Sequence, residues 1–279
     1  MAARQQAELS AKGPRPLRVG LLQTAPTFNA VEENLAQIAA LRADLGAVDL
    51  AVTPELSATG YGFVEAEEDT LLRCDDPRLA ELAAAGVGVG FAERCDTGLP
   101  WNSYRIGAGL QRKLYPVSYA PWNEHLLFQP GSTLEPTEVA DARVATVICN
   151  DMWHPAVPWL AARGGAEVLV VPVASIAGAD PEGIRRTWAI IVQHAAILLQ
   201  CYVVFVNRCG VDSGEPFWGG SRVVGPDGET LASLGAEPGA VAVDLDLAAL
   251  RRRRAEVPLL AEERVELVAD LLRRAERHV

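Results

Sequence analysis

The sequence predicts an α/β fold that forms one continuous unit, and two observations carry this prediction. Short apolar segments of strand length alternate with segments in which apolar residues recur every three or four positions, and this alternation is typical of helices packed on a sheet. No internal repeat and no flexible linker interrupts the pattern before residue 250. With 49% hydrophobic residues, the chain can also form a large core.

The first half of the chain is predicted to contain strands and helices in turn, followed by a hairpin. The predicted strands, hairpin included, are residues 17–23, 49–52, 87–92, 101–109 and 110–113. Asn29 is expected to cap the first helix. Asp76 is expected to open the second, with Pro77 in its first turn. A loop rich in proline and aromatic residues then spans residues 115–131.

The second half repeats the alternation and then turns to strands alone. Its predicted strands are residues 144–149, 167–171 and 202–207, followed by a meander of residues 219–224, 229–234 and 240–245. Pro155 begins a helix that ends at Gly164, and Asp180 with Pro181 begins a longer one. The apolar stripe of this longer helix is expected to be core, and it comprises Ile184, Trp188, Ile191, Ala195 and Leu198.

The ends of the chain differ from its middle. Residues 1–16 are expected to form a flexible N-terminal tail, and residues 17–279 a single domain with 251–279 as a C-terminal extension. Within that extension, residues 262–278 predict a charged helix that packs on the domain or on a second subunit. The basic run at residues 251–254 is interpreted as a solvated helix face or an interface element.

Composition excludes several classes of function. With 36 acidic and 25 basic side chains the formal net charge is −11, which argues against nucleic acid or an anionic membrane as a partner. The five cysteines include no CxxC pair, so neither a disulfide framework nor a zinc site is indicated, and no metal or cofactor is expected. The first sixteen residues lack the apolar segment of a secretory signal. The expected location is therefore the cytoplasm.

Three chemically reactive residues follow predicted strands. Glu55, Lys113 and Cys149 each lie at or near the end of such a strand. Taken singly they have ordinary interpretations: a turn glutamate, a solvated lysine and a packed thiol. Together they would meet at the sheet edge where α/β proteins assemble their sites. A thiol with a pKa of about 8.5 needs a neighbouring cation or base to become a nucleophile at neutral pH.

Three motifs around these residues occur in a fixed order. They are PELSATGY from residue 54, RKLYPVSYAPWNE from residue 112 and ICNDMWHP from residue 148. This set resembles the nitrilase superfamily of carbon–nitrogen hydrolases, and the likeness extends from residue 17 to about residue 250. The resemblance implies a four-layer α-β-β-α sandwich and a Glu-Lys-Cys triad.

The resemblance also implies a role for each matching residue. Glu55 corresponds to the general base, Lys113 to the cationic stabiliser and Cys149 to the nucleophile. Glu124 corresponds to an additional glutamate that orients the substrate and the lysine. Lys113 and the backbone N–H of Asn150 would then hold the oxyanion of the tetrahedral intermediate.

The expected reaction is hydrolysis of a small linear amide or N-carbamoyl compound through an acyl-cysteine, with release of ammonia. A true nitrilase is one alternative, a catalytically silent scaffold is another, and a Cys-His peptidase that uses His154 is a third. Residues 150–156 depart from the common family pattern, so the pocket of relatives does not transfer to this chain. The substrate-binding candidates are Asn150, Tyr61, Trp122, Trp153 and His154.

The family resemblance also bears on assembly. A homo-oligomer, either a dimer or a multiple of dimers, is the partner expected besides the small-molecule amide, ureide or nitrile. No synthetase domain follows residue 250, so ammonia channelling within this polypeptide is not expected.

Overall fold

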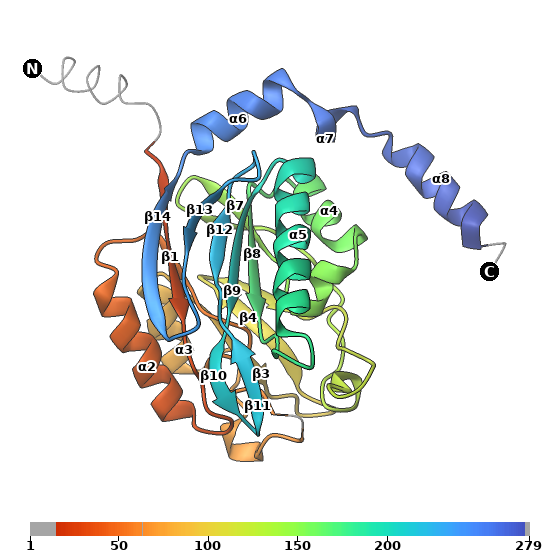
Figure 1. Cartoon of the computed structure of the whole chain (residues 1–279). Helices are drawn as coiled ribbons and strands as arrows, with labels where there is room; N and C mark the ends of the chain where they lie inside the picture. Colours follow the sequence, from red (N-terminus) through yellow and green to blue (C-terminus); the bar gives the residue numbers. More distant parts are fainter. Residues whose placement is uncertain (1–14, 63, 277–279) are drawn as a thin grey trace, which may run out of the picture.

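A computed structural model describes residues 15–62 and 64–276 (Figure 1). Of the expected tail at residues 1–16, all but Arg15 and Pro16 lies outside the described residues. Two six-stranded sheets pack face to face, and helices cover both outer faces. The four-layer α-β-β-α sandwich implied by the resemblance is therefore confirmed. The covering helices are α2 (Val31–Asp44) and α3 (Pro77–Ala84) on one face, and α4 (Ala156–Arg163) and α5 (Pro181–Leu199) on the other.

The first sheet has the strand order β14-β1-β2-β3-β4-β5. Its three central strands are parallel, because a helix follows each of the first two, whereas β14, β4 and β5 run antiparallel to their neighbours. The bounds are β1 (Leu17–Gln23), β2 (Leu50–Val52), β3 (Val87–Glu93), β4 (Trp101–Ile106), β5 (Gly109–Arg112) and β14 (Gly239–Leu245).

The second sheet has the order β13-β12-β9-β8-β7-β6, again with a parallel centre. A separate hairpin, β10 with β11, follows β9. The bounds are β6 (Thr137–Val139), β7 (Ala142–Thr146), β8 (Val168–Val173), β9 (Tyr202–Asn207), β10 (Cys209–Asp212), β11 (Glu215–Trp218), β12 (Arg222–Val224) and β13 (Thr230–Ser233).

The central strands are buried on both faces, which explains their continuous apolar sequences. In β8, Val168 and Val170 point between the two sheets, whereas Leu169 and Val171 point toward α4 and α5. Because side chains alternate along a strand, one run of apolar residues serves two separate cores.

Several local predictions were wrong. The meander is divided between the sheets, because β14 leaves β13 and pairs with β1 along its whole length. Asn29 does not cap α2: it has a left-handed backbone (φ 62°), and Ala30 is the N-cap. Its Oδ1 instead accepts a hydrogen bond from Thr70 Oγ1 at 3.0 Å. The stripe on α5 is only partly core, since Leu198 is 52% exposed.

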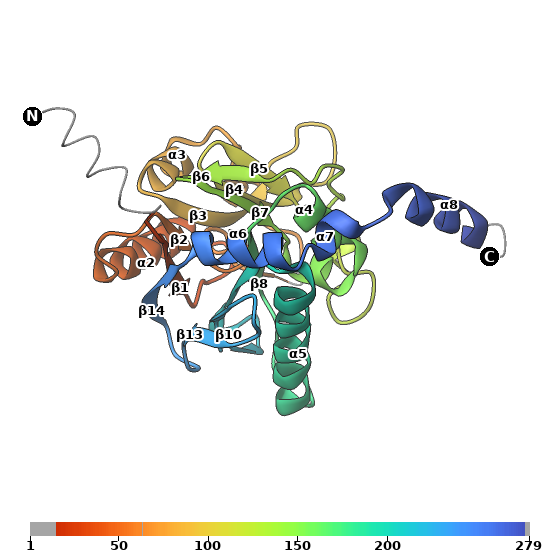
Figure 2. The same ribbon diagram turned by 90° about the horizontal axis from the view of Figure 1, so that it is seen from above.

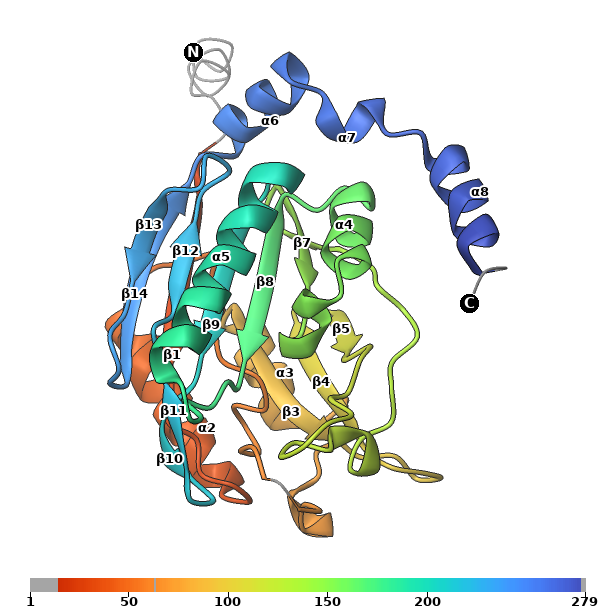
Figure 3. The same cartoon turned by 45° about the vertical axis from the view of Figure 1, so that its right-hand side comes forward.

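The C-terminal segment forms α6 (Leu247–Glu256), α7 (Leu259–Glu262) and α8 (Val265–Ala275). Seen from above, α6 crosses the ends of the strands (Figure 2). Its basic run binds the chain itself: Arg251 pairs with Glu167 at 2.6 Å, and Arg254 donates to the carbonyl of Gln200. In contrast, α8 projects away from the layers (Figure 3). Among the described residues, no helix has both the length and the apolarity needed to cross a membrane.

Candidate active site

Glu55 is buried in the turn that follows β2, with only 1% of its surface exposed. Its Oε1 accepts hydrogen bonds from Asn102 Nδ2 at 2.8 Å and from Lys113 Nζ at 2.7 Å. Its Oε2 accepts one from the backbone N–H of Ala174 at 2.9 Å. The next residue, Leu56, has a left-handed backbone (φ 50°). The turn is thus held in a sparsely populated conformation, as is common at functional sites.

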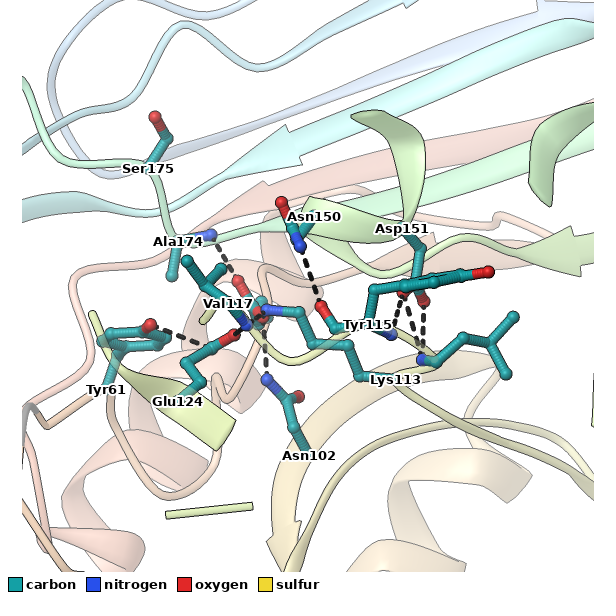
Figure 4. A network of polar contacts seen from close by, with 12 residues as sticks. Tyr61, Asn102, Lys113, Tyr115, Val117, Glu124, Asn150, Asp151, Ala174 and Ser175 are labelled. Carbon is teal, nitrogen blue, oxygen red and sulfur yellow. Dashed lines mark hydrogen bonds and ion pairs between the residues drawn. The ribbon is translucent and has the colours of Figure 1, made fainter. Parts of the chain in front are cut away.

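Lys113 follows β5 and is as deeply buried as Glu55. Its ammonium group donates to Glu55 and, at 2.6 Å, to Glu124 Oε2 (Figure 4). Burial alone lowers the pKa of Lys113, but the carboxylates of Glu124 and Glu55 outweigh it and raise this pKa well above its usual value. Lys113 is therefore a fixed cation, and its third N–H remains available for a further acceptor.

Glu124 begins a short 3-10 helix, Glu124–Leu126, within the predicted loop. Besides Lys113, its carboxylate accepts hydrogen bonds from the Tyr61 hydroxyl at 2.9 Å and from the Val117 backbone N–H at 2.8 Å. These contacts join the lysine to the loop around it. Glu124 thus holds the Lys113 ammonium together with Glu55, and Figure 4 shows its contacts with Lys113, Tyr61 and Val117.

Cys149 lies on a sharp turn between β7 and α4. The strand ends at Thr146, three residues before the predicted end, and Cys149 opens a 3-10 helix, Cys149–Trp153. The backbone of Cys149 is left-handed (φ 47°), which costs a non-glycine residue about 1–2 kcal/mol. Such a strained turn between a strand and a helix is the way α/β hydrolases expose a nucleophile.

The electrostatics place the proton on the thiol in the resting protein. Burial raises the pKa of Cys149 well above its usual value, and the Glu55 carboxylate adds to the rise while Lys113 opposes it. Burial also raises the pKa of Glu55, although Lys113 lowers it. A carboxylate with a raised pKa beside a protonated thiol is suited to accept that proton when the sulfur attacks an electrophile.

A cavity of about 110 Å³ opens beside Cys149. Of the predicted substrate-binding residues, Tyr61, Trp122, Asn150 and Trp153 line it. His154 does not, because its ring stacks on Tyr115 with centroids 3.8 Å apart. The full lining is Tyr61, Val117, Tyr119, Trp122, Cys149, Asn150, Trp153, Ala174, Ser175, Ile184 and Trp188.

Sequence reasoning missed several residues of this site. Ile184 and Trp188 were assigned to the core as part of an apolar stripe, but both line the cavity. Asn102 on β4 and Ala174 in the loop after β8, both distant from Glu55 in sequence, hold its carboxylate. Asp151 was the most accessible to prediction, because a carboxylate inside the buried ICNDM segment requires hydrogen-bond donors.

Asp151 ties the loop after Lys113 to the turn that carries Cys149. Its carboxylate accepts hydrogen bonds from the backbone N–H groups of Leu114, at 3.1 Å, and of Tyr115, at 2.8 Å. The neighbouring Asn150 side chain donates to the carbonyl of Tyr115 at 2.9 Å. The two residues after Cys149 thus fix the two residues after Lys113.

The Asp151→Asn variant is expected to flatten part of the pH dependence of stability. Burial raises the pKa of Asp151 to about 7, although Lys113 lowers it, whereas an unfolded aspartate has a pKa of about 3.9. Between these values the folded state binds more protons than the unfolded state. The wild type should therefore lose stability relative to the variant as pH rises, by at most about 1.4 kcal/mol per pH unit. Urea denaturation across this window measures the difference, and parallel curves would contradict the prediction.

Comparison with known proteins identifies relatives of this arrangement. The carbon-nitrogen hydrolase family model matches residues 18–255. A protein of Pseudomonas protegens described as a hydrolase in the pqqF 5' region is 28% identical in an alignment of 279 positions. The alignment covers 96% of each chain. The deaminated glutathione amidase of Rattus norvegicus is 32% identical over 154 residues, which cover 54% of this chain and 46% of that protein.

A solved structure gives the same picture. An amidase variant from Nesterenkonia sp. AN1, described as showing the result of Michael addition of acrylamide at the active site cysteine, superposes with a TM-score of 0.70 at 27% identity. The superposition covers 86% of this chain and 98% of that one. The buried Glu-Lys-Glu cluster and the strained cysteine therefore occur in a chain whose relatives include amidases.

Proposed function

The chain belongs to the carbon-nitrogen hydrolase family, and we propose that it hydrolyses a small linear amide or N-carbamoyl compound through a covalent acyl-cysteine, releasing ammonia. One observation carries this proposal. Glu55, Lys113 and Glu124 form a buried, hydrogen-bonded cluster beside Cys149, at a cavity that admits only a small molecule. A scaffold protein would gain nothing from burying two carboxylates and an ammonium group together.

In the proposed first half-reaction, the Cys149 sulfur attacks the carbonyl carbon while Glu55 accepts the thiol proton. The negative charge that develops on the carbonyl oxygen is stabilised by the third N–H of Lys113 and by the backbone N–H of Asn150. The carbon–nitrogen bond then breaks, and Glu55 returns the proton to the departing nitrogen. Ammonia leaves, and the acyl group remains on Cys149 as a thioester.

In the second half-reaction, water attacks the thioester while Glu55 accepts one of its protons. The same oxyanion contacts serve again, because the carbonyl oxygen has not moved. Collapse of this intermediate breaks the carbon–sulfur bond, and Glu55 protonates the sulfur. The product is released as a carboxylic acid from an amide or as a carbamic acid from an N-carbamoyl compound, and Cys149 is again a thiol. Glu55 thus transfers a proton in each direction in both half-reactions.

An ammonia-release assay on a panel of small amides, ureides and nitriles tests this function. We expect turnover of primary amides or ureides. Turnover of nitriles alone would assign the chain to the true nitrilases, and turnover of nothing on the panel, by protein that is folded, would favour the scaffold alternative.

We also propose that the chain forms a homo-oligomer built from dimers, with a second copy of the chain covering an apolar groove. This groove, of about 750 Å³, lies between α4 and α5, and two of its lining residues, Ile190 and Leu198, are 59% and 52% exposed. A second apolar surface is one face of the α8 helix. No residue of α8 is buried, and the helix projects away from the layers (Figure 3). Two copies can cover both surfaces, since every copy supplies both.

The Leu198→Glu variant is expected to weaken this association, because it places a charge in the groove. Light scattering after gel filtration should show a dimer or a larger even-numbered assembly for the wild type and smaller particles for the variant. Val211→Glu is the matched control, since Val211 is 74% exposed on β10 outside the groove. A monomeric wild type would contradict the proposal.

Two further expectations from the sequence stay predictions. Residues 17–279 are proposed to act as a single domain. The cytoplasmic location is supported by the five cysteines, all of which are free thiols.

A further inference from the structure

The cavity beside Cys149 adjoins a larger one, here called the outer cavity. The outer cavity has a volume of about 540 Å³ and shares Trp122, Ser175 and Ile184 with the cavity at the thiol. Because the two cavities share these three residues, we infer that a substrate whose carbonyl carbon reaches Cys149 directs its acyl chain past them toward the outer cavity. The groups that line the outer cavity meet the far end of that chain.

In the part of the chain that the structure describes, no lysine, arginine or histidine side chain lines either cavity. The Lys113 ammonium, which acts on the Cys149 thiol, already bonds to Glu55 and Glu124. Two guanidinium groups of neighbouring segments lie against aromatic rings instead: Arg185 on Trp218 and the buried Arg208 on Phe217, and Arg208 also pairs with Asp212. An acyl chain that ends in a carboxylate would find no counter-ion in these cavities.

The charged side chains that line the outer cavity are Asp180 and Glu215. Among the described residues, neither carboxylate forms an ion pair. Asp180 accepts a hydrogen bond from the Gly183 backbone N–H at 2.8 Å as the N-cap of α5. Within the described residues Glu215 has no comparable side-chain hydrogen bond, so we take it as the carboxylate available to a ligand.

The position of Glu215 is fixed by the hairpin that carries it. Glu215 is half-buried at the start of β11. The hairpin is attached to the loop after β8 by the bridge between Ile176 and Phe217 and by a hydrogen bond of 2.8 Å from the Ala177 N–H to the Pro216 carbonyl. That loop also contains Ala174 and Ser175, which line the cavity at the thiol. These contacts therefore connect Glu215 with the cavity beside Cys149.

We propose that the preferred substrates are amides whose acyl chain ends in a positively charged amine, that Glu215 binds this amine, and that amides ending in a carboxylate are poor substrates. This inference rests on the proposed function and names its substrate class. The cavity beside Cys149 is lined mainly by apolar and aromatic side chains, so it accepts the methylene groups next to the carbonyl. The formal net charge of −11 favours the approach of a cation over that of an anion.

Two matched pairs of substrates test the charge preference. In the first pair, 4-aminobutanamide replaces the terminal methyl of pentanamide with an ammonium group, and we expect its kcat/KM to be higher by about tenfold. In the second pair, succinamate replaces the branched end of 4-methylpentanamide with a carboxylate. We expect its kcat/KM to be lower by at least about tenfold. A preference for succinamate would overturn the inference.

Variants of Glu215 separate its role from general effects of charge. Glu215→Gln is expected to raise KM for 4-aminobutanamide, and so to remove most of the advantage of this amide over pentanamide in kcat/KM. Glu215→Lys is expected to reverse the preference and to improve succinamate. Arg185→Gln is the control, because its guanidinium lies outside both cavities, and it should preserve the wild-type pattern. An unchanged ratio in Glu215→Gln, or lost discrimination in Arg185→Gln, would overturn the assignment to Glu215.

Binding to the Cys149→Ala variant distinguishes failure of this inference from failure of the proposed function. Calorimetric titration of that variant with the four amides requires no chemistry. Tighter binding of 4-aminobutanamide without turnover by the wild type would reject the proposed function and keep the charge preference. Ammonia release by the wild type, together with tighter binding of succinamate to Cys149→Ala, would keep the proposed function and reject the charge preference.

Discussion

Replacing Cys149 with alanine is expected to abolish ammonia release, lowering kcat/KM by on the order of 10⁴-fold or more, because the proposed acyl intermediate forms on the sulfur that this substitution removes. The variant should still fold. Alanine is smaller than cysteine, and the cost of the left-handed backbone at this position is the same for both residues. Ammonia release by purified protein, together with thermal unfolding, measures the two effects separately.

His154→Ala is the matched control for this variant. The imidazole is five residues from Cys149 in sequence but stacks on Tyr115 and does not line the cavity. We expect kcat/KM to stay within a few-fold of the wild-type value. A Cys-His peptidase would lose activity equally in the two variants. Full turnover by Cys149→Ala would reject the assignment of the nucleophile altogether.

Replacing Glu55 with glutamine is expected to lower kcat by on the order of 10³-fold, because an amide cannot accept the thiol proton or activate water. The substitution also disturbs the local hydrogen bonds. Both carboxylate oxygens face donors: Asn102 and Lys113 on one side and the Ala174 N–H on the other. A glutamine must turn its own NH₂ toward one of these donors, so some loss of stability is expected as well.

A second buried glutamate provides the control for that loss of stability. Glu93 is 2% exposed and also faces only donors, since it accepts hydrogen bonds from Arg112 and Ser103. It does not line the cavity at Cys149. Glu93→Gln should therefore lower the melting temperature but retain turnover in the folded enzyme. Equal losses of kcat in the two variants would mean that Glu55 acts through the fold and not as a base.

The sequence predicted much of the layer architecture because the strands are buried on both faces. Continuous apolar runs such as β8, where all six residues are apolar and buried, can be recognised without any contact information. The partner of each strand is harder to predict. The chain crosses from one sheet to the other between β13 and β14, so that β14 pairs with β1. The local sequence pattern does not indicate this crossing.

Part of the site could also be predicted, because its reactive residues follow strands that the sequence reveals. Glu55, Lys113 and Cys149 could be grouped because each follows a strand, and motif order supplied Glu124. The residues that support them come from distant segments, for example Asn102 and Ala174, whose roles depend on the packing of two sheets. On α5 the apolar stripe was misread, because a helical period shows that a face is apolar but not what it faces: Trp188 faces the cavity and Leu198 is exposed.

The central claim is that Cys149 carries the acyl group, and intact-mass spectrometry of the Glu55→Gln variant tests it most directly. After incubation with an amide that the wild type hydrolyses, we predict a mass increase equal to the acyl group, located by peptide mapping on Cys149, with about one equivalent of ammonia released per chain. The Glu55→Gln, Cys149→Ala double variant should show no increase. Ammonia release with no adduct, or an adduct on a different residue, would contradict the account.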